Sequence, residues 1–250
     1  DGFDLEAELG KLVGMDELKA RLRHFKQSMD SDRRLRDGGI DSLTQSYHLW
    51  LTGNPGTGKT TVARLLHKMF IAARVLQQGA PFVEFKPTDA EGDAMGEARL
   101  KTKEYIERAA HGVLFADEAH TLVMDRQNMY GKQVASELMN CLQTPLAEGG
   151  CIVVFAGYPG GMKTLLQSDP GFHRRIPMQH RFALADYTTN ELAQIFRKMV
   201  ENLRGWSLDA EVTDDLVAAA IDRATTLDFR SHQNGSIAEE LLTSTKEQGV

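Results

Sequence analysis

A short glycine-rich segment holds the first residues whose order could do chemistry. Residues 53–60 read Gly-Asn-Pro-Gly-Thr-Gly-Lys-Thr, with an apolar stretch before them and a helix-forming stretch after them. Glycines let consecutive backbone N–H groups turn towards one anion without a clash from a Cβ. The order therefore predicts a P-loop that cradles the phosphates of a nucleotide. In it, Lys59 would reach the β- and γ-phosphates and the Thr60 hydroxyl would bind Mg²⁺.

Two adjacent acids follow a later apolar segment. Asp117 and Glu118 come directly after Val113–Ala116. Such a pair alone often only marks a strand that ends at solvent, but downstream of a P-loop it is typical of the second half of a nucleotide site. We expect this strand to lie beside the P-loop strand, with its carboxyl end in the same crevice. Asp117 would then hold Mg²⁺, directly or through water, and Glu118 would polarise the attacking water as general base.

Hydrolysis of a nucleotide also needs positive charge opposite the γ-phosphate as the transition state forms. Arg174 and Arg175 follow a Pro-Gly turn within residues 169–176 and are candidates for that charge. An arginine pair in a loop is also a common solvated surface feature, so the residues alone leave both interpretations open.

The elements that must position these groups alternate between strand and helix. We expect strands at 48–52, 81–86, 113–116 and 151–156, and helices at 59–77, 97–110 and 131–148. Alternation of this kind predicts a parallel sheet covered by helices on both faces. Residues 151–156 are the most apolar run in the chain, so we expect them at the centre of the sheet.

After residue 186 the pattern becomes helical only. Apolar residues repeat at helical spacing in two stretches, and a third helix is expected from Ser236; the repeating residues are Leu192, Ile195, Phe196, Met199 and Leu203, then Leu216, Ala220 and Ala224. One further amphipathic helix is expected at 15–30, where Leu18, Leu22, Phe25 and Met29 share a face. The expected domains are an α/β nucleotide-binding domain at 1–185 and a small helical domain at 186–250.

Composition narrows the class of protein. The 250 residues carry a net charge of −6 and have a pI of about 5.8, which argues against a nucleic-acid binder. No apolar run is long enough for a membrane span. Cys141 and Cys151 lie in apolar stretches without zinc-site spacing, which favours core positions in a reducing compartment. The first residue is Asp1, so we expect the natural N-terminus to be missing and take the cytoplasm as the default location.

Five segments in order resemble one family. They are Leu12-Val13-Gly14, GNPGTGKTT at 53–61, GVLFADEAH at 112–120, VVFAGY at 153–158 and DPGFHRRI at 169–176. Together they resemble AAA+ ATPases of the CbbX/CfxQ group, which contains red-type rubisco activases, and stage V sporulation protein K is similar. The resemblance implies a P-loop NTPase sheet followed by a helical lid, and a ring, usually a hexamer, that uses Mg-ATP to remodel a protein partner. Rubisco is then one possible client, and a plastid stroma a second possible location.

The resemblance also assigns residues. Val13 and Gly14, with Leu12, match the segment that borders the adenine. Arg175 matches the arginine finger that enters the neighbouring subunit's site, with Arg174 second, and Tyr158 lies nearest the sensor-1 position. The expected ATP-binding set is therefore Val13, Gly14, Gly53, Asn54, Pro55, Gly56, Thr57, Gly58, Lys59, Thr60 and Thr61.

Two positions depart from the family pattern. Ala94, within Gly92–Gly96, stands where a pore loop carries an aromatic residue, and Met95 offers only a softer contact. Gly235 stands where the lid carries a sensor-2 arginine, and Arg230 is the nearest substitute. These departures support an alternative function, a nucleotide-binding regulatory or scaffold subunit. The retained Glu118 favours hydrolysis, because a subunit that only binds nucleotide needs no general base. A DNA-acting ATPase fits poorly, since the chain is acidic and has no DNA-binding module.

Overall fold

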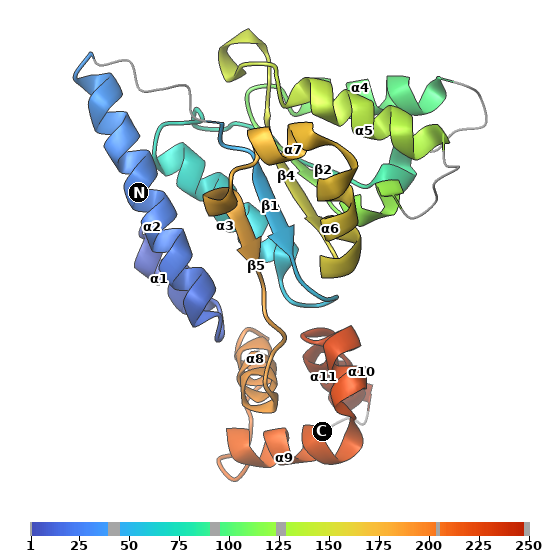
Figure 1. Ribbon diagram of the computed structural model, residues 1–250. Coiled ribbons are helices and arrows are strands. Elements are labelled where there is room, and N and C mark those ends of the chain that lie inside the picture. The colour runs from blue at the N-terminus through green and yellow to red at the C-terminus, as the bar shows by residue number, and fades with distance from the viewer. Residues whose placement is uncertain (1, 40–45, 91–95, 124–128, 204–205, 248–250) are drawn as a thin grey trace.

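A parallel sheet forms the centre of the computed structural model, which describes residues 2–39, 46–90, 96–123, 129–203 and 206–247 (Figure 1). The sheet has the order β2-β3-β4-β1-β5, and every neighbouring pair of strands is parallel. The strands are β1 (Leu49–Thr52), β2 (Phe82–Phe85), β3 (Val113–Ala116), β4 (Ile152–Gly157) and β5 (Arg181–Ala183). The predicted parallel sheet is confirmed, and β4, which lies within the most apolar run, is its middle strand.

Helices cover both faces of the sheet, as expected. On β1, Leu49 and Leu51 face one core and Trp50 faces the other, because successive side chains of a strand point to opposite faces. The first core is closed by α1 (Leu5–Lys11), α2 (Asp16–Asp37) and α3 (Lys59–Ala72). The second is closed by α4 (Glu97–Arg108), α5 (Met129–Cys141), α6 (Pro159–Ser168) and α7 (Pro170–Arg175).

The helix predicted at 15–30 is present and longer than expected, since α2 continues to Asp37. Its four predicted apolar residues are all buried in the first core. Single turns of 3₁₀ helix lie at Pro87–Ala90, Ala119–Val123, Leu146–Glu148 and Met178–His180. Within the described part of the chain, no helix combines the length and apolar character needed to cross a membrane.

The C-terminal part is helical and lies beyond the carboxyl end of β1 (Figure 1). It contains α8 (Thr189–Glu201), α9 (Asp214–Ala224), α10 (Leu227–Gln233) and α11 (Ser236–Glu247). A capping box, in which Thr188 and Glu191 exchange hydrogen bonds, starts α8. Phe196, Val200 and Ala238 are buried between α8 and α11. We refer to these four helices as the lid.

The strand order corrects one expectation. β3, which carries Asp117 and Glu118 at its end, does not lie beside β1, because β4 occupies the place between them. Two strand spacings, roughly 10 Å, therefore separate the ends of β1 and β3. This distance leaves room between the P-loop and the two acids.

Several element boundaries also differ from the expectation. The helix predicted at 59–77 ends at Ala72, because Arg74 adopts a left-handed conformation with φ of 55° that turns the chain. The helix predicted at 131–148 ends at Cys141, ahead of Pro145, which lacks the N–H that a continued helix needs. The helix predicted at 97–110 ends two residues early, at Arg108.

Other elements were not predicted at all. They are α1, α6, α7, α10 and β5, each of ten residues or fewer. In α9 the predicted apolar stripe of Leu216, Ala220 and Ala224 is exposed, whereas Ala218 and Ile221 face inward. The prediction of the inward face was wrong because the neighbouring face of the same helix, with Val217, Ala218 and Ile221, is also apolar.

Candidate active site

The loop that joins β1 to α3 has the conformation its glycines allow. Gly56 and Gly58 have φ of +70° and +86°, in the left-handed region that favours glycine. The Thr57 hydroxyl donates to Asn54 O at 2.8 Å and closes the loop on itself. A Cβ at Gly53 would lie 2.6 Å from that hydroxyl, so the first glycine is needed for this turn.

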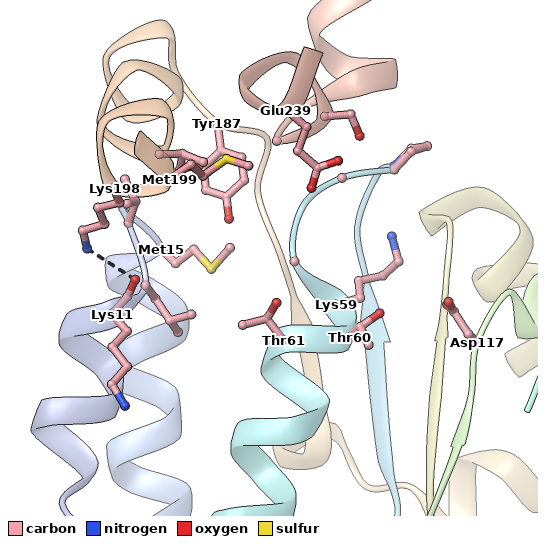
Figure 2. Close-up of a pocket in the computed structure, with 18 of the residues that line it drawn as sticks. Lys11, Met15, Lys59, Thr60, Thr61, Asp117, Tyr187, Lys198, Met199 and Glu239 are labelled. Carbon is pink, nitrogen blue, oxygen red and sulfur yellow. Dashed lines mark hydrogen bonds between the residues drawn. The ribbon is translucent and has the colours of Figure 1, made fainter. Parts of the chain in front are cut away.

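Lys59 is the first residue of α3 and its side chain folds back into the loop. Its Nζ donates to Gly53 O at 2.9 Å and to Asn54 O at 2.8 Å. Figure 2 shows the side chain directed upward from the start of α3. Burial lowers the pKa of Lys59, and the nearby carboxylates of Asp117 and Glu118 oppose that shift. The ammonium is therefore held, partly desolvated, beside the loop carbonyls.

Asp117 and Glu118 follow β3 at the same edge of the sheet as the loop. Asp117 lies across the cavity from Lys59 and Thr60 (Figure 2). Glu118 has φ of 52°, and its N–H donates to Asp117 Oδ1 at 2.9 Å. A strained left-handed residue at this point turns the second carboxylate away from the direction of the strand.

Lys86, the residue directly after β2, pairs with Glu118. Its Nζ lies 2.9 Å from Glu118 Oε1, and this hydrogen bond is the main cause that raises the pKa of Lys86. The sequence placed Lys86 only at the end of a strand. The carboxyl ends of parallel strands meet at one edge, and that rule was the signal that could have identified Lys86 as a partner for the two acids.

Tyr158 lies between Lys59 and a buried histidine. Its ring centroid is 5.3 Å from Lys59 Nζ and 4.2 Å from the ring centroid of His120. Burial lowers the pKa of His120, and its Nδ1 has no hydrogen-bond partner among the described residues. The ring of Tyr158 thus offers its face to the P-loop cation from the end of β4.

One cavity of about 560 Å³ brings most of these residues together. Lys59, Thr60, Thr61, Asp117 and Glu118 line one end of it. The other end is more apolar and is shared between the α1–α2 connection and the lid; its residues are Lys11, Leu12, Val13, Met15, Tyr187, Ile195, Lys198, Met199 and Asn202. Sequence reasoning identified Leu12 and Val13 but missed the lid residues, whose helical pattern only indicated packing.

Gly14 lies in the connection between α1 and α2, between Val13 and Met15, which line this apolar end, but does not line the cavity itself. It has φ of +59°, and Met15 after it also has φ of +59°. A Cβ at Gly14 would lie 2.6 Å from Cδ of Glu191 in the lid. The turn and the start of α8 therefore fit together only because residue 14 has no side chain.

The arginines singled out in the sequence do not lie at the cavity of their own chain. Arg175 is the last residue of α7, a helix rather than the expected loop, and its Nη1 contacts Met139 Sδ at 3.4 Å. Arg174 is exposed on the same helix. Neither lines the cavity described above. Arg230 pairs with Asp222 at 2.7 Å in the lid and does not reach the cavity either.

The lid position matched by Gly235 lies at the cavity wall, together with Ser236 and Glu239 from α11. Figure 2 shows the carboxylate of Glu239 directed towards the P-loop. The predicted pore-loop residues Gly92, Ala94 and Met95 lie outside the described residues, so the structure does not bear on that departure.

The cavity fits a magnesium nucleotide by its chemistry. The described residues contain no cluster of three or more His, Cys, Asp or Glu that could hold a metal alone. Mg²⁺ commonly binds through one or two protein oxygens together with substrate phosphates, and Thr60 and Asp117 supply such oxygens. A volume of about 560 Å³ is within the range of small-molecule sites, and the cavity pairs a cationic end with an apolar end.

Comparisons with known proteins agree with this chemistry. A family model described as "ATPase family associated with various cellular activities (AAA)" matches residues 49–178, just over half of the chain. A second model, described as a domain of unknown function (DUF8495), matches residues 186–248.

Individual relatives extend the likeness beyond the matched segment. Stage V sporulation protein K of Bacillus subtilis (strain 168) is 32% identical over 208 residues, which cover 83% of this chain and 63% of the relative. Protein CbbX of Cereibacter sphaeroides is 33% identical over 193 residues, covering 77% and 61%. The chloroplastic ribulose bisphosphate carboxylase/oxygenase activase of Cyanidioschyzon merolae (strain NIES-3377 / 10D) is 33% identical over 211 residues, covering 83% and 65%.

The chain thus spans less than two thirds of the length of each of these three relatives. The resemblance inferred from the sequence motifs is confirmed by the family match and by the names of the relatives. With its parallel sheet, its P-loop and its helical C-terminal part, the chain belongs to the AAA family of ATPases as a CbbX-like member.

Proposed function

We propose that the chain binds ATP with Mg²⁺ and hydrolyses it, within a ring that remodels a protein partner. The observation that carries this proposal is the shared cavity in which Lys59, Thr60, Asp117 and Glu118 converge opposite an apolar wall. Membership in a family of ATPases supports the same reaction. Likeness to CbbX and to a rubisco activase supports a protein client, of which ribulose bisphosphate carboxylase/oxygenase is one candidate.

Each residue has a defined task in this proposal. Lys59 exchanges its two loop carbonyls for phosphate oxygens when nucleotide enters. Thr60 and Asp117 would hold Mg²⁺ through their oxygens, and the bound ion would supply charge neutralisation at the phosphates. A Glu118 carboxylate oxygen accepts the proton of the attacking water, and its bond to Lys86 must loosen for that step.

The apolar end of the cavity is proposed to hold the adenine. Val13, which lines the cavity, and the adjacent Gly14 would border one side of the base, while Ile195 and Met199 from α8 would cover the other. Base and phosphates would then lie across the boundary between the domains proposed at 1–185 and 186–250. Closure of the lid on the base would exclude water from the phosphates.

Arg175 is proposed to act on the site of a neighbouring subunit. It does not line the cavity of its own chain, and α7 places it half-buried beside Met139. A guanidinium that is always charged suits a transition state in which negative charge spreads over the phosphate oxygens. We place this ring in the cytoplasm or in a plastid stroma, the latter because one relative is chloroplastic.

A second function is favoured by one observation, the ion pair between Lys86 and Glu118. A general base whose carboxylate stays bound to a lysine cannot accept a proton readily. In that case the chain would be a nucleotide-binding regulatory or scaffold subunit that supports a ring without turnover. We favour hydrolysis, because both partners of the pair are partly exposed and such pairs are weak.

Steady-state ATP hydrolysis across a range of protein concentrations tests both functions. We expect turnover that rises with concentration and that falls by two or more orders of magnitude, on the order of 10²-fold, in Glu118→Gln. Tight ATP binding without turnover in the unaltered chain would refute hydrolysis and favour the regulatory subunit. Turnover that does not depend on concentration would refute a finger supplied by a neighbour.

A further inference from the structure

The turn between α10 and α11 lies directly on the P-loop. The N–H of Gly235 donates to Gly56 O at 3.1 Å, and the Tyr187 hydroxyl donates to Thr57 O at 3.4 Å. A Cβ at Gly235 would lie 2.7 Å from Gly56 O, and a Cβ at Gly56 would collide with Gln233 O. The two glycines therefore permit a backbone contact between the lid and the phosphate-binding loop.

Asn234, beside Gly235, is the buried centre of this contact. The residue is only 1% exposed, and its φ of 44° lies in the left-handed region. Its Oδ1 accepts from Tyr187 N at 3.0 Å, and its Nδ2 donates to Asp186 Oδ1 at 3.1 Å and to Ser231 O at 2.9 Å. Both donors and the acceptor of the amide are thus satisfied, as a buried amide requires.

Asp186 carries the contact on to the P-loop itself. Asn54 Nδ2 donates to both carboxylate oxygens of Asp186 at 3.0 Å. Hydrogen bonds to an ionised group are stronger than those between neutral groups. We call Asn54, Gly56, Asp186, Asn234 and Gly235 the latch, because this set joins two loop residues to three residues at the edge of the lid.

The charged lid residues at the cavity indicate that the lid contacts the P-loop through the latch rather than through the phosphates. Lys198 is the one cationic side chain that the described lid residues bring to the cavity wall. Its Nζ donates to Gly10 O at 3.1 Å and to Lys11 O at 3.3 Å (the latter contact is visible in Figure 2). Glu239, from the first turns of α11, faces the P-loop with a negative charge. The lid thus reaches the loop through the latch, while the Lys198 ammonium lies at the apolar end of the cavity beside Lys11, away from Lys59 (Figure 2).

We propose that Asn234 is a positioning residue which couples the lid to the P-loop, so that the lid responds to occupation of the loop by ATP or ADP alike rather than to the γ-phosphate. This rests on the proposed nucleotide binding. A nucleotide bound in the loop stabilises the loop conformation in which Asn54 and Gly56 form their hydrogen bonds to the lid. In return, the latch holds the loop in the conformation that binds phosphate. Loss of the latch lowers the affinity for ATP and the affinity for ADP by the same factor.

The variant Asn234→Gly tests this coupling without adding backbone strain, because glycine adopts a positive φ freely. We expect the Kd of fluorescent ADP and of a fluorescent, non-hydrolysable ATP analogue to rise equally, by about tenfold, a factor that corresponds to the net contribution of about one hydrogen bond. Amide exchange at Gly235 should accelerate by about as much in the nucleotide-free chain.

A paired exchange separates positioning from simple loss of stability. Asn234→Asp alone places its carboxylate against that of Asp186 and should lower the affinity for both nucleotides. Adding Asp186→Asn restores a carboxylate–amide pair in the opposite order. Ser231 O then loses its donor and Asn54 keeps one acceptor instead of two, so the double variant should recover only part of the affinity. Gly235→Arg should weaken both nucleotides as well, since its Cβ displaces the turn from Gly56 O.

Three results would overturn the proposal. The first is that Asn234→Gly lowers the affinity for the ATP analogue but not that for ADP. The second is that Asn234→Gly leaves both affinities unchanged while Lys59→Ala abolishes binding. The third is that the rate of amide exchange at Gly235 is unchanged in Asn234→Gly. If the unaltered chain bound neither nucleotide, the proposed function would fail. The exchange measurement on the nucleotide-free chain would still decide whether Asn234 holds the lid on the loop.

Discussion

His48 gives the fold a defined sensitivity to acid. The residue precedes β1, is 7% exposed, and accepts from Val153 N at Nδ1 over 3.0 Å while its Nε2 lies 3.2 Å from Leu142 O. This arrangement needs the neutral ring with its proton on Nε2. Burial lowers the pKa of His48 from 6.5 to about 4, although the bond to Leu142 O opposes the shift. The folded chain therefore resists protonation that the unfolded chain accepts.

The magnitude follows from linkage between proton binding and folding. Between the folded and unfolded pKa values the unfolded chain binds more protons, so the free energy of unfolding falls as the pH falls below 6.5. At 1.36 kcal/mol for each pH unit, His48 should cost about 2 kcal/mol of stability by pH 5 and about 3 kcal/mol by pH 4. That is a large part of the ~5–15 kcal/mol typical of a folded protein.

Urea unfolding of the unaltered chain and of His48→Asn, at steps between about pH 7.5 and pH 4.5, isolates this contribution. The variant should be less stable at neutral pH by about 1–3 kcal/mol, because Leu142 O loses its donor. Its curve should then converge with that of the unaltered chain as the pH falls, since other acid-sensitive groups are common to both. Parallel curves over the whole range would show that His48 is not the buried neutral group described here.

Three further predictions concern the site. Lys59→Ala should abolish tight ATP binding measured by calorimetry; unchanged affinity would contradict the assignment of the P-loop. Arg175→Ala should suppress turnover while the oligomer seen by size-exclusion chromatography persists, and loss of the oligomer alone would leave the finger unsupported. Lys86→Met should raise turnover by up to about fivefold, the limit set by an exposed ion pair of about 1 kcal/mol, because it frees Glu118. A fall in turnover would mean that Lys86 instead positions the base.

The sequence predicted the parts whose chemistry is tied to local order. Residues 53–60 and the pair Asp117–Glu118 could be assigned because the motif fixes both residue types and spacing, and the buried strands because their apolar runs are continuous. The place of β4 between β1 and β3 could not be predicted, since strand order depends on how the chain returns across the sheet. β5 was missed because three residues carry too little pattern.

Contacts that join distant residues were also beyond the sequence. Lys86 and Glu118 are 32 residues apart, and Asn54 and Asp186 are 132 apart. Gly235 could be matched to a lid position, but its hydrogen bond to Gly56 O depends on how the lid sits over the loop. Such pairings are set by tertiary structure, which local spacing does not encode.

The fit of Gly14 against Glu191 bears on how this chain could be recombined with its relatives. Residue 14 lies at the start of the chain and residue 191 in the lid, yet the space for a Cβ at one is filled by the side chain of the other. A lid grafted from another protein would have to fit sterically against this turn even in the absence of nucleotide. Chimeras should therefore exchange the α1–α2 turn and α8 together, and a graft that keeps glycine at position 14 should tolerate a long side chain at position 191.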